Sequence, residues 1–416
     1  MATTEDRWHS QNPKNPDARI CSEHSSRRAQ LYPSSQHGTG KRWAVRWRDE
    51  SRKERRKSFT RKGDADSFAA KITHELEVGQ HIDPAARKTL LRTVAEEWLS
   101  SAEHRPTTAE GARRQLELHV LPYLGDRAVG GLKRGDIQRW LKDRQKTLAG
   151  STTAIVYGRL KAVLTYAVHN DLIGKNPCAG IPAPKVTKKE VKPLPANVVA
   201  ALVAAAPPRY RAMVLLAAGS GLRHGELVGL EISHLDLDAG EVHVRQQAVR
   251  LDKGDPYIGP PKTDQSYRAV PLAKGVVEAL SEHVRRFPPV AVELDDRTDP
   301  RKPHSRTAHL VFGNGHGRPI NGGGWSRVWS NTVKRANASL AASGGAVPAG
   351  ASMHDLRHTY ASLLIAHRES VKTVQKRLGH AKASVTLDVY VHLFDEVEDT
   401  TREAVQNVLG DIDVTY

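Results

Sequence analysis

The stretch "HDLRHTYASLLIAH", residues 354–367, combines two kinds of helix surface. Its second half has the apolar spacing of a helix that packs against a core. Its first half places His354, Arg357 and His358 at i, i+3 and i+4, so two imidazoles and a guanidinium share one side of the first turn. Such groups are costly to bury, and their place at the start of an apolar helix calls for a functional explanation.

Composition favours a multidomain protein that binds a polyanion. The chain has 416 residues and a formal net charge of +17, which indicates two or three domains and, first among partners, nucleic acid. A generally basic surface is the alternative. Neither an apolar run of 18 residues nor a signal-peptide pattern occurs, so we expect a cytoplasmic protein. Cys21 and Cys178 are too few for a disulfide framework or a cysteine-rich zinc site, and we expect no metal and no cofactor.

The N-terminal region predicts a short disordered segment followed by a small α+β domain. Residues 1–36 are polar and lack periodicity, which is typical of disorder. Residues 41–49 alternate in polarity, 53–60 fit a returning strand and 64–76 have helical spacing, so we place a domain at 37–85. Residues 41–62 hold eleven Lys or Arg against three Asp or Glu. Both a DNA-groove reader and a solvated charged hairpin fit this segment.

The rest of the chain predicts two larger domains. Residues 86–184 have helical periodicity throughout and predict an all-α bundle. Residues 185–196 are rich in Pro and Lys and predict an extended linker. Residues 197–416 predict a mixed α+β, mainly helical domain with a C-terminal tail, in which 292–309 is a polar insertion or loop.

Several residues of the last domain could carry chemistry, although each has a structural explanation when taken alone. Arg223 and Glu226 share a helix face and could form only an ion pair. Lys262 could be a solvated loop lysine, and Tyr390, between two valines, a core aromatic. The pair His354 and His358 could in principle bind zinc, but the motif HExxH requires a Glu after the first His, where this chain has Asp.

Together, these residues include the side-chain types that cleavage of a phosphodiester without a metal ion requires. Arginine forks neutralise nonbridging oxygens, histidines donate hydrogen bonds or move protons, lysine can protonate a leaving oxygen, and tyrosine can supply a nucleophile. The sequence contains no dense carboxylate cluster of the kind that a two-metal nuclease requires.

At these residues the chain resembles the tyrosine recombinases, specifically the lambda-type integrases of phages and mobile elements. The resemblance spans about residues 40–395 and is most specific in "GLRHGEL", "PKTDQSYRAVPL", "HDLRHTYAS", "LGH" and "TLDVYVHL". The positions that match the six catalytic residues of the family are, in order, Arg223, Lys262, His354, Arg357, His380 and Tyr390.

The resemblance implies a role for each position. Tyr390 would attack the scissile phosphate and form a 3′-phosphotyrosyl link, while Arg223 and Arg357 clamp the phosphate. Lys262 would protonate the 5′-oxygen and His354 would assist proton transfer.

Two further positions follow from the same resemblance. His380 would donate a hydrogen bond to the phosphate, and Glu226 would support the site. The interval from His380 to Tyr390 is ten residues, where some family members have nine. This leaves Tyr360 and Tyr416 as alternative tyrosines.

The resemblance also assigns the domains and the partners. It implies an arm-binding domain at 37–85, a core-binding domain at 86–184 and a catalytic domain at 197–416, acting as a homotetramer on double-stranded DNA with core-type and arm-type sites. Strand exchange would pass through a Holliday junction and integrate or excise a mobile element in a bacterial host cell, with an excisionase or a DNA-bending protein as a further partner. The basic residues expected to contact arm DNA are Lys41, Arg42, Arg46, Arg48, Arg55 and Arg56.

Three alternatives remain open at this point. The chain could be an inactive or regulatory DNA-binding protein, an Xer-like resolution recombinase, or a type IB topoisomerase-like nicking and closing enzyme. The arm domain favours an integrase over the Xer type, and the intact six positions favour an enzyme over a pure binder.

Overall fold

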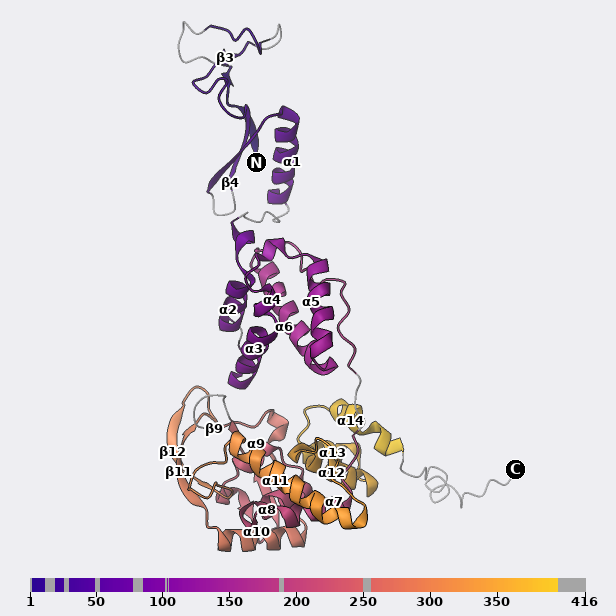
Figure 1. Cartoon of the computed structure of the whole chain (residues 1–416). Helices are drawn as coiled ribbons and strands as arrows, with labels where there is room; N and C mark the ends of the chain where they lie inside the picture. The colour runs from indigo at the N-terminus through magenta and orange to yellow at the C-terminus, as the bar shows by residue number, and fades with distance from the viewer. Residues whose placement is uncertain are drawn as a thin grey trace, which may run out of the picture. The chain divides into compact units, whose positions relative to one another are not determined.

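The computed structural model divides the chain into two compact units, Met1–Thr187 and Lys188–Tyr416 (Figure 1). The unit boundary falls inside the predicted linker, 185–196. The structure describes residues 2–11, 19–25, 30–48, 53–77, 85–101, 103, 105–186, 191–249 and 256–395. The tail 396–416 therefore lies outside the described residues. No helix in the described ranges is long and apolar enough to cross a membrane.

The first unit begins with a three-stranded antiparallel sheet and a helix. The strands β1 (Thr3–Asp6), β4 (Trp43–Arg48) and β5 (Glu54–Phe59) are ordered β1-β4-β5, and α1 (Lys62–Glu77) lies along one face (Figure 1). Val45 and Trp47 pack with Ala65, Ala69 and Ile72 of the helix. The predicted hairpin and helix are confirmed, because alternation along β4 directs its apolar side chains toward α1.

The prediction of disorder for residues 1–36 is wrong where the structure describes them. The strand β1 pairs with β4 from Thr3↔Arg46 to Asp6↔Trp43, and β2 (His9–Ser10) pairs with β3 (Tyr32–Pro33). An edge strand gains backbone hydrogen bonds whatever its side chains are, so the polar sequence of β1 gave no periodic signal.

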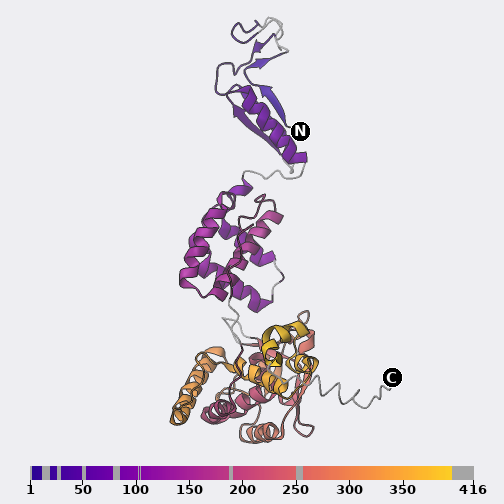
Figure 2. The same ribbon diagram turned by 90° about the vertical axis from the view of Figure 1, so that its right-hand side faces the viewer.

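The second part of this unit is helical, as predicted. Its helices share one core that includes Leu116, Ile137, Trp140, Leu160 and Val163, and Figure 2 shows them from a second side. The elements are η1 (Ala86–Lys88), α2 (Leu91–Ser101), α3 (Pro106–His119), α4 (Leu121–Leu124), η2 (Val129–Gly131), α5 (Arg134–Thr147) and α6 (Gly150–His169).

The second unit is a mixed α+β domain in which helices predominate. Its sheets have the orders β10-β7-β6 and β12-β11-β9-β8. Its core joins Met213 and Leu216 to Leu356 and Leu378 across three helices. The helices are α7 (Ala196–Ala205), α8 (Pro208–Ser220), α9 (His224–Val228), α10 (Lys274–Arg286), α11 (Gly322–Leu340), α12 (Met353–Ala366), α13 (Val371–Leu378) and α14 (Ala383–Asp395), with η3 (Ile232–His234), η4 (Asp264–Ser266) and η5 (Ala341–Ser343) between them. The strands are β6 (Leu235–Asp236), β7 (Glu241–Val244), β8 (Gln247–Val249), β9 (Tyr257–Gly259), β10 (Arg268–Pro271), β11 (Val290–Asp296) and β12 (His304–Leu310).

The polar segment 292–309, predicted as an insertion or loop, forms most of a β-hairpin. The strands β11 and β12 pair from Val290↔Leu310 to Asp296↔His304, on the side of the unit opposite α14 (Figure 1). The Arg306 guanidinium donates hydrogen bonds to Asp296 and to Glu231, so charges that look solvated in the sequence are paired across strands.

Candidate active site

The helix α12 begins with a capping box that fixes its first turn. Ser352 Oγ accepts a hydrogen bond from the His354 backbone N–H at 3.2 Å, and Asp355 Oδ2 accepts one from the Ser352 N–H at 2.8 Å. Leu356 faces the core, which orients the polar side of this turn toward the loops before α9 and after α13. The cap therefore positions the charged side chains of the turn.

Arg357 is a buried cation held by two helix ends. Its side chain donates to the Gly221 carbonyl at 2.6 Å and to the Leu378 carbonyl at 2.7 Å. Gly221 has φ +63, and a Cβ there would lie 2.5 Å from Tyr360 Cδ1, so this close approach requires glycine.

The charge of Arg357 has no carboxylate ion-pair partner among the described residues. Burial, and next the nearby Arg223, lower the pKa of Arg357 to about 9, so the side chain remains charged at neutral pH. A buried and uncompensated cation is costly, and a bound anion would relieve that cost.

Arg223 comes to the same place from another element. It is the N-cap of α9, and its guanidinium donates to Glu226 Oε1 at 2.9 Å, to Ser266 Oγ at 3.2 Å and to the Gly379 carbonyl at 3.0 Å. It is half-buried, which leaves part of the fork open to a ligand.

Glu226 joins Arg223 to a residue that the sequence analysis missed. Arg268 donates to Glu226 Oε2 at 2.8 Å, and both side chains are buried. The two guanidinium groups, Arg268 first, outweigh the effect of burial and hold the pKa of Glu226 below its usual value. Arg268 lies in the quoted stretch "YRAVPL", but its partner is 42 residues away, so only the fold reveals the pair.

Lys262 and His354 lie at the exposed side of the site. Lys262 is exposed in the turn between β9 and η4. Partial loss of solvent, then the Arg357 charge, lower the pKa of His354, and the Lys262 charge adds to this effect. His354 is therefore a neutral imidazole at pH 7, able to accept or donate a proton.

His380 directly follows the left-handed Gly379 that ends α13. Its Nδ1 lies 2.9 Å from Thr386 Oγ1 of α14. Burial, and next the Arg357 charge, lower its pKa to about 3. A neutral ring that accepts from Thr386 through Nδ1 carries its proton on Nε2, where it can donate to a phosphate oxygen.

Tyr390 is the tyrosine of this cluster. Its side chain is buried on α14, and its hydroxyl lies 2.7 Å from His358 Nδ1. Burial raises the pKa of Tyr390 to about 12 despite the Arg357 charge. Tyr360 instead packs in the core beside Gly221, and Tyr416 lies outside the described residues.

His358 is a second residue that was not among the six predicted catalytic positions. Burial, and next the neighbouring His354, lower its pKa to about 4, so the ring is neutral, and in the tautomer with its proton on Nε2 its Nδ1 accepts a hydrogen bond from the Tyr390 hydroxyl. The signal available in the sequence was its position four residues after His354, on the same helix face.

The structure separates the basic residues that were predicted to contact arm DNA. Arg42 is half-buried and donates to Asp6 Oδ2 at 2.8 Å. Arg55 lies opposite Trp47 in the register of β4 and β5, and therefore on the face that α1 covers. These two arginines have structural partners that would have to be displaced before they could bind a phosphate.

The remaining four lie on more open surfaces. Lys41 and Arg48 are exposed at the two ends of β4. Arg46 and Arg56 pair across β4 and β5 on the face away from α1, where both contact the Glu5 carboxylate. These ion pairs are more exposed than that of Arg42 with Asp6 and cost less to displace, so this face is the better candidate for contact with a polyanion.

Comparison with known proteins shows which family the chain belongs to. The phage integrase central domain matches residues 91–183, and the phage integrase family matches 186–396. The tyrosine recombinase XerC-like protein of Caldanaerobacter subterraneus subsp. tengcongensis is 25% identical over 387 residues, which cover 87% of this chain and 94% of that protein. The putative prophage phiRv2 integrase of Mycobacterium tuberculosis is 25% identical over 342 residues, 80% of this chain and 83% of that one.

Solved structures share the fold. The Tn1549 transposon integrase in complex with transposon right end DNA matches with a TM-score of 0.64 and 20% identity, covering 77% of this chain and 100% of that chain. A lambda integrase dimer bound to a COC′ core site matches with a TM-score of 0.54 and 17% identity, covering 85% and 93%. Because the family model spans just over half of the chain, residues 186–396 of 416, the chain belongs to the phage integrase family of tyrosine recombinases.

Proposed function

We propose that this chain is an integrase that cuts and rejoins DNA through a covalent 3′-phosphotyrosyl intermediate at Tyr390. The observation that carries the proposal is the Tyr390 hydroxyl, held by His358 in one cluster with the buried Arg357, whose charge has no ion-pair partner among the described residues. A phosphodiester placed there would bring its anionic oxygens to the cation and its phosphorus to the phenol.

The proposed first step exchanges one ester for another. The Tyr390 oxygen forms a bond to phosphorus as the bond from phosphorus to the 5′-oxygen breaks. The phenol loses its proton as the bond to phosphorus forms, a transfer that His354 assists, and Lys262 protonates the departing 5′-oxygen. The bond energy stays in the phosphotyrosine, so the freed 5′-hydroxyl of a partner strand can reverse the step without ATP.

The charge that develops on the phosphate is balanced by groups from three places in the fold. Arg223 before α9 and Arg357 on α12 bind the nonbridging oxygens, and His380 before α14 donates a further hydrogen bond. Glu226 does not contact substrate in this proposal. It orients Arg223 through a 2.9 Å hydrogen bond and is held by Arg268.

The layout supports a role in mobile-element integration. The sheet β1-β4-β5 with basic residues precedes the helical domain, as an arm-binding domain would. The Tn1549 and lambda integrase structures are described as DNA complexes, the latter also as a tetramer on a Holliday junction. By analogy, we propose that this chain exchanges strands as a homotetramer on core-type sites, in a bacterial cytoplasm, with arm-type sites and a DNA-bending partner setting direction.

Covalent trapping tests the proposal. Nicked suicide duplexes from the DNA that flanks this gene would be incubated with the wild type and with Tyr390→Phe. We expect an SDS-resistant protein–DNA complex for the wild type alone, with equal non-covalent binding by both proteins. Tyr360→Phe is the matched control and should still form the complex. The proposal would be contradicted by a covalent complex that persists in Tyr390→Phe. It would also be contradicted if the wild type formed no covalent complex on DNA that it binds with all partners present.

A second arm of the same experiment distinguishes the alternatives. Joining of two different duplexes would indicate a recombinase, while relaxation of supercoils alone would indicate a topoisomerase-like activity. Binding without any cleavage would indicate a regulatory DNA-binding protein.

A further inference from the structure

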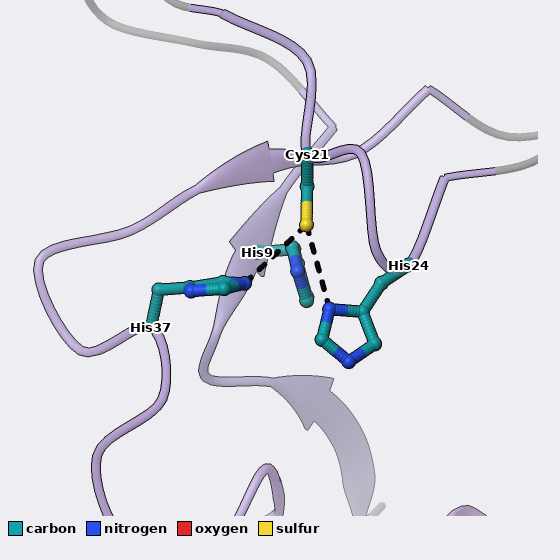
Figure 3. A group of neighbouring side chains, drawn as sticks. All are labelled: His9, Cys21, His24 and His37. Atoms are coloured by element: carbon teal, nitrogen blue, oxygen red, sulfur yellow. Dashed lines mark hydrogen bonds between the residues drawn. The ribbon is translucent and has the colours of Figure 1, made fainter.

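Four side chains of the N-terminal segment converge outside the candidate active site. His9 on β2, Cys21, His24 and His37 each direct one ligand atom inward, and these atoms all lie within 4.8 Å of one another (Figure 3). Cys21 Sγ lies 3.4 Å from His24 Nδ1 and 3.3 Å from His37 Nε2. Three imidazoles and one thiol are ligands that transition metals favour.

His9 is oriented as if to present a lone pair to the centre. Its Nδ1 lies 3.0 Å from Asp6 Oδ2, and Arg42 holds the same carboxylate at 2.8 Å. Its Nε2 is buried and has no hydrogen-bond partner. A carboxylate that accepts the Nδ1 proton fixes the tautomer with a free lone pair on Nε2, which is the common arrangement of a metal-binding histidine.

The segment also lacks any other core. Of its described residues between 9 and 37, only His9 and Cys21 are buried. The hydrophobic cluster formed by β4, β5 and α1 includes no described residue from this segment. A module of this size without an apolar core usually needs a disulfide or a metal ion, and the chain's other cysteine, Cys178, belongs to the helical core.

We propose that His9 Nε2, Cys21 Sγ, His24 Nδ1 and His37 Nε2 bind one structural zinc ion. Zinc bonds of about 2.3 Å to sulfur and about 2.0–2.1 Å to nitrogen, at tetrahedral angles, place sulfur and nitrogen about 3.5 Å apart, close to the separations around Cys21. Four protein ligands close the coordination shell, so this zinc holds structure and activates no water. On binding, the Cys21 thiol releases its proton to solvent, and the thiolate and the Asp6 carboxylate balance the 2+ charge.

This zinc site would attach residues 9–37 to the edge of the sheet. His9 follows β1 by three residues, and β1 pairs with β4. The proposal replaces our expectation that the chain binds no metal. That expectation rested on the small number of cysteines and on the pair His354 and His358, and it did not consider a site of one cysteine and three histidines. It is independent of the DNA chemistry proposed above, since none of the four ligands lies in the unit that contains Tyr390.

Metal titration of the full-length protein tests the site. Metal-free protein would be titrated with zinc against a colorimetric chelator for the wild type, Cys21→Ala and, as the matched control for the second buried cysteine, Cys178→Ala. We expect one tight equivalent for the wild type and for Cys178→Ala, and at least 100-fold weaker binding for Cys21→Ala. Equal binding by the wild type and Cys21→Ala, or no tight equivalent in the wild type, would overturn the proposal.

Two further measurements do not depend on how the cysteine variant folds. Cobalt added to the metal-free wild type should give the thiolate-to-cobalt charge-transfer band and the intense visible bands of a tetrahedral site; octahedral cobalt without that band would refute the thiolate ligand. Asp6→Asn should weaken zinc binding by about 10–100-fold, because the orientation of His9 is lost. Asp126→Asn, at an exposed Asp paired with Arg92, is its control and should leave zinc binding unchanged.

Discussion

Replacing His358 by leucine should slow covalent complex formation without weakening DNA binding. Within the described residues, the His358 ring is the only hydrogen-bond partner of the Tyr390 hydroxyl, at 2.7 Å. Loss of a neutral hydrogen bond costs about 0.5–1.5 kcal/mol, and a buried hydroxyl left without a partner costs about 1–3 kcal/mol. Because the unpartnered hydroxyl would turn toward another acceptor, the variant would have to pay this cost to return it to the attacking position. At about 1.4 kcal/mol for each tenfold, we expect a rate loss of about 5- to 100-fold.

The pKa values decide which role His358 has. The pKa of Tyr390 is raised to about 12 and that of His358 is lowered to about 4, both by burial. Proton transfer between groups that differ by about 8 pKa units costs roughly 11 kcal/mol. His358 therefore positions the phenol and does not remove its proton, and the ratio of wild-type to variant rates should stay constant from pH 6 to 9.

Single-turnover trapping on suicide duplexes measures this effect. His367→Leu, an exposed histidine directly after the same helix, is the matched control and should react at the wild-type rate. A His358→Leu rate within twofold of the wild type would refute the positioning role. A rate ratio that changes across pH 6 to 7 would show instead that His358 titrates there and acts as a base.

Three further predictions concern stability, metal dependence and the N-terminal domain. Glu226→Gln should lower the free energy of unfolding by about 3–5 kcal/mol in urea denaturation, because Arg268 would be left buried without its ion-pair partner. Since the pKa of Glu226 is lowered in the folded state, its contribution to stability is present above the unfolded-state pKa and is lost as pH falls through the folded-state pKa. Unchanged stability in the variant would refute the ion-pair argument. Cleavage of core-type duplexes should persist in EDTA, and a loss that magnesium but not zinc restores would contradict a metal-free reaction. Deleting residues 1–85 should abolish arm-type binding in gel-shift assays while core-type cleavage remains, and unchanged arm-type binding would refute that assignment.

The candidate residues from Arg223 to Tyr390 lie in short local motifs, and their order can be read from the sequence. The capping box of Ser352 and Asp355 is also local, but it was not predicted. The contacts of Arg268 with Glu226 and of Tyr390 with His358 could not be read, because they join elements 42 and 32 residues apart. The contact of Tyr390 with His358 depends on how α12 and α14 pack, and no local pattern in the sequence encodes that packing.

The errors in the fold have one physical origin. Periodicity detects elements that bury an apolar face, but β1 gains its stability at a sheet edge and β12 pairs charged side chains such as Arg306 with Asp296. The cluster of His9, Cys21, His24 and His37 was not predicted for a related reason, since these residues are spread over a polar segment. Polar residues that are paired or that share a ligand look the same in a sequence as solvated ones.

The two hydrogen bonds from Arg357 to the carbonyls of Gly221 and Leu378 join two parts of the domain, in addition to the phosphate-binding role proposed for this residue. Inactivating substitutions should therefore have two different fates in a cell. A chain that loses only the Tyr390 hydroxyl keeps its fold, occupies its sites and blocks intact copies, which makes it a dominant inhibitor. A chain that loses Arg357 also loses both of these hydrogen bonds, so we expect a larger fraction of it to be unfolded and degraded, which would make the defect recessive. Genetic dominance would then separate loss of chemistry from loss of stability at this site.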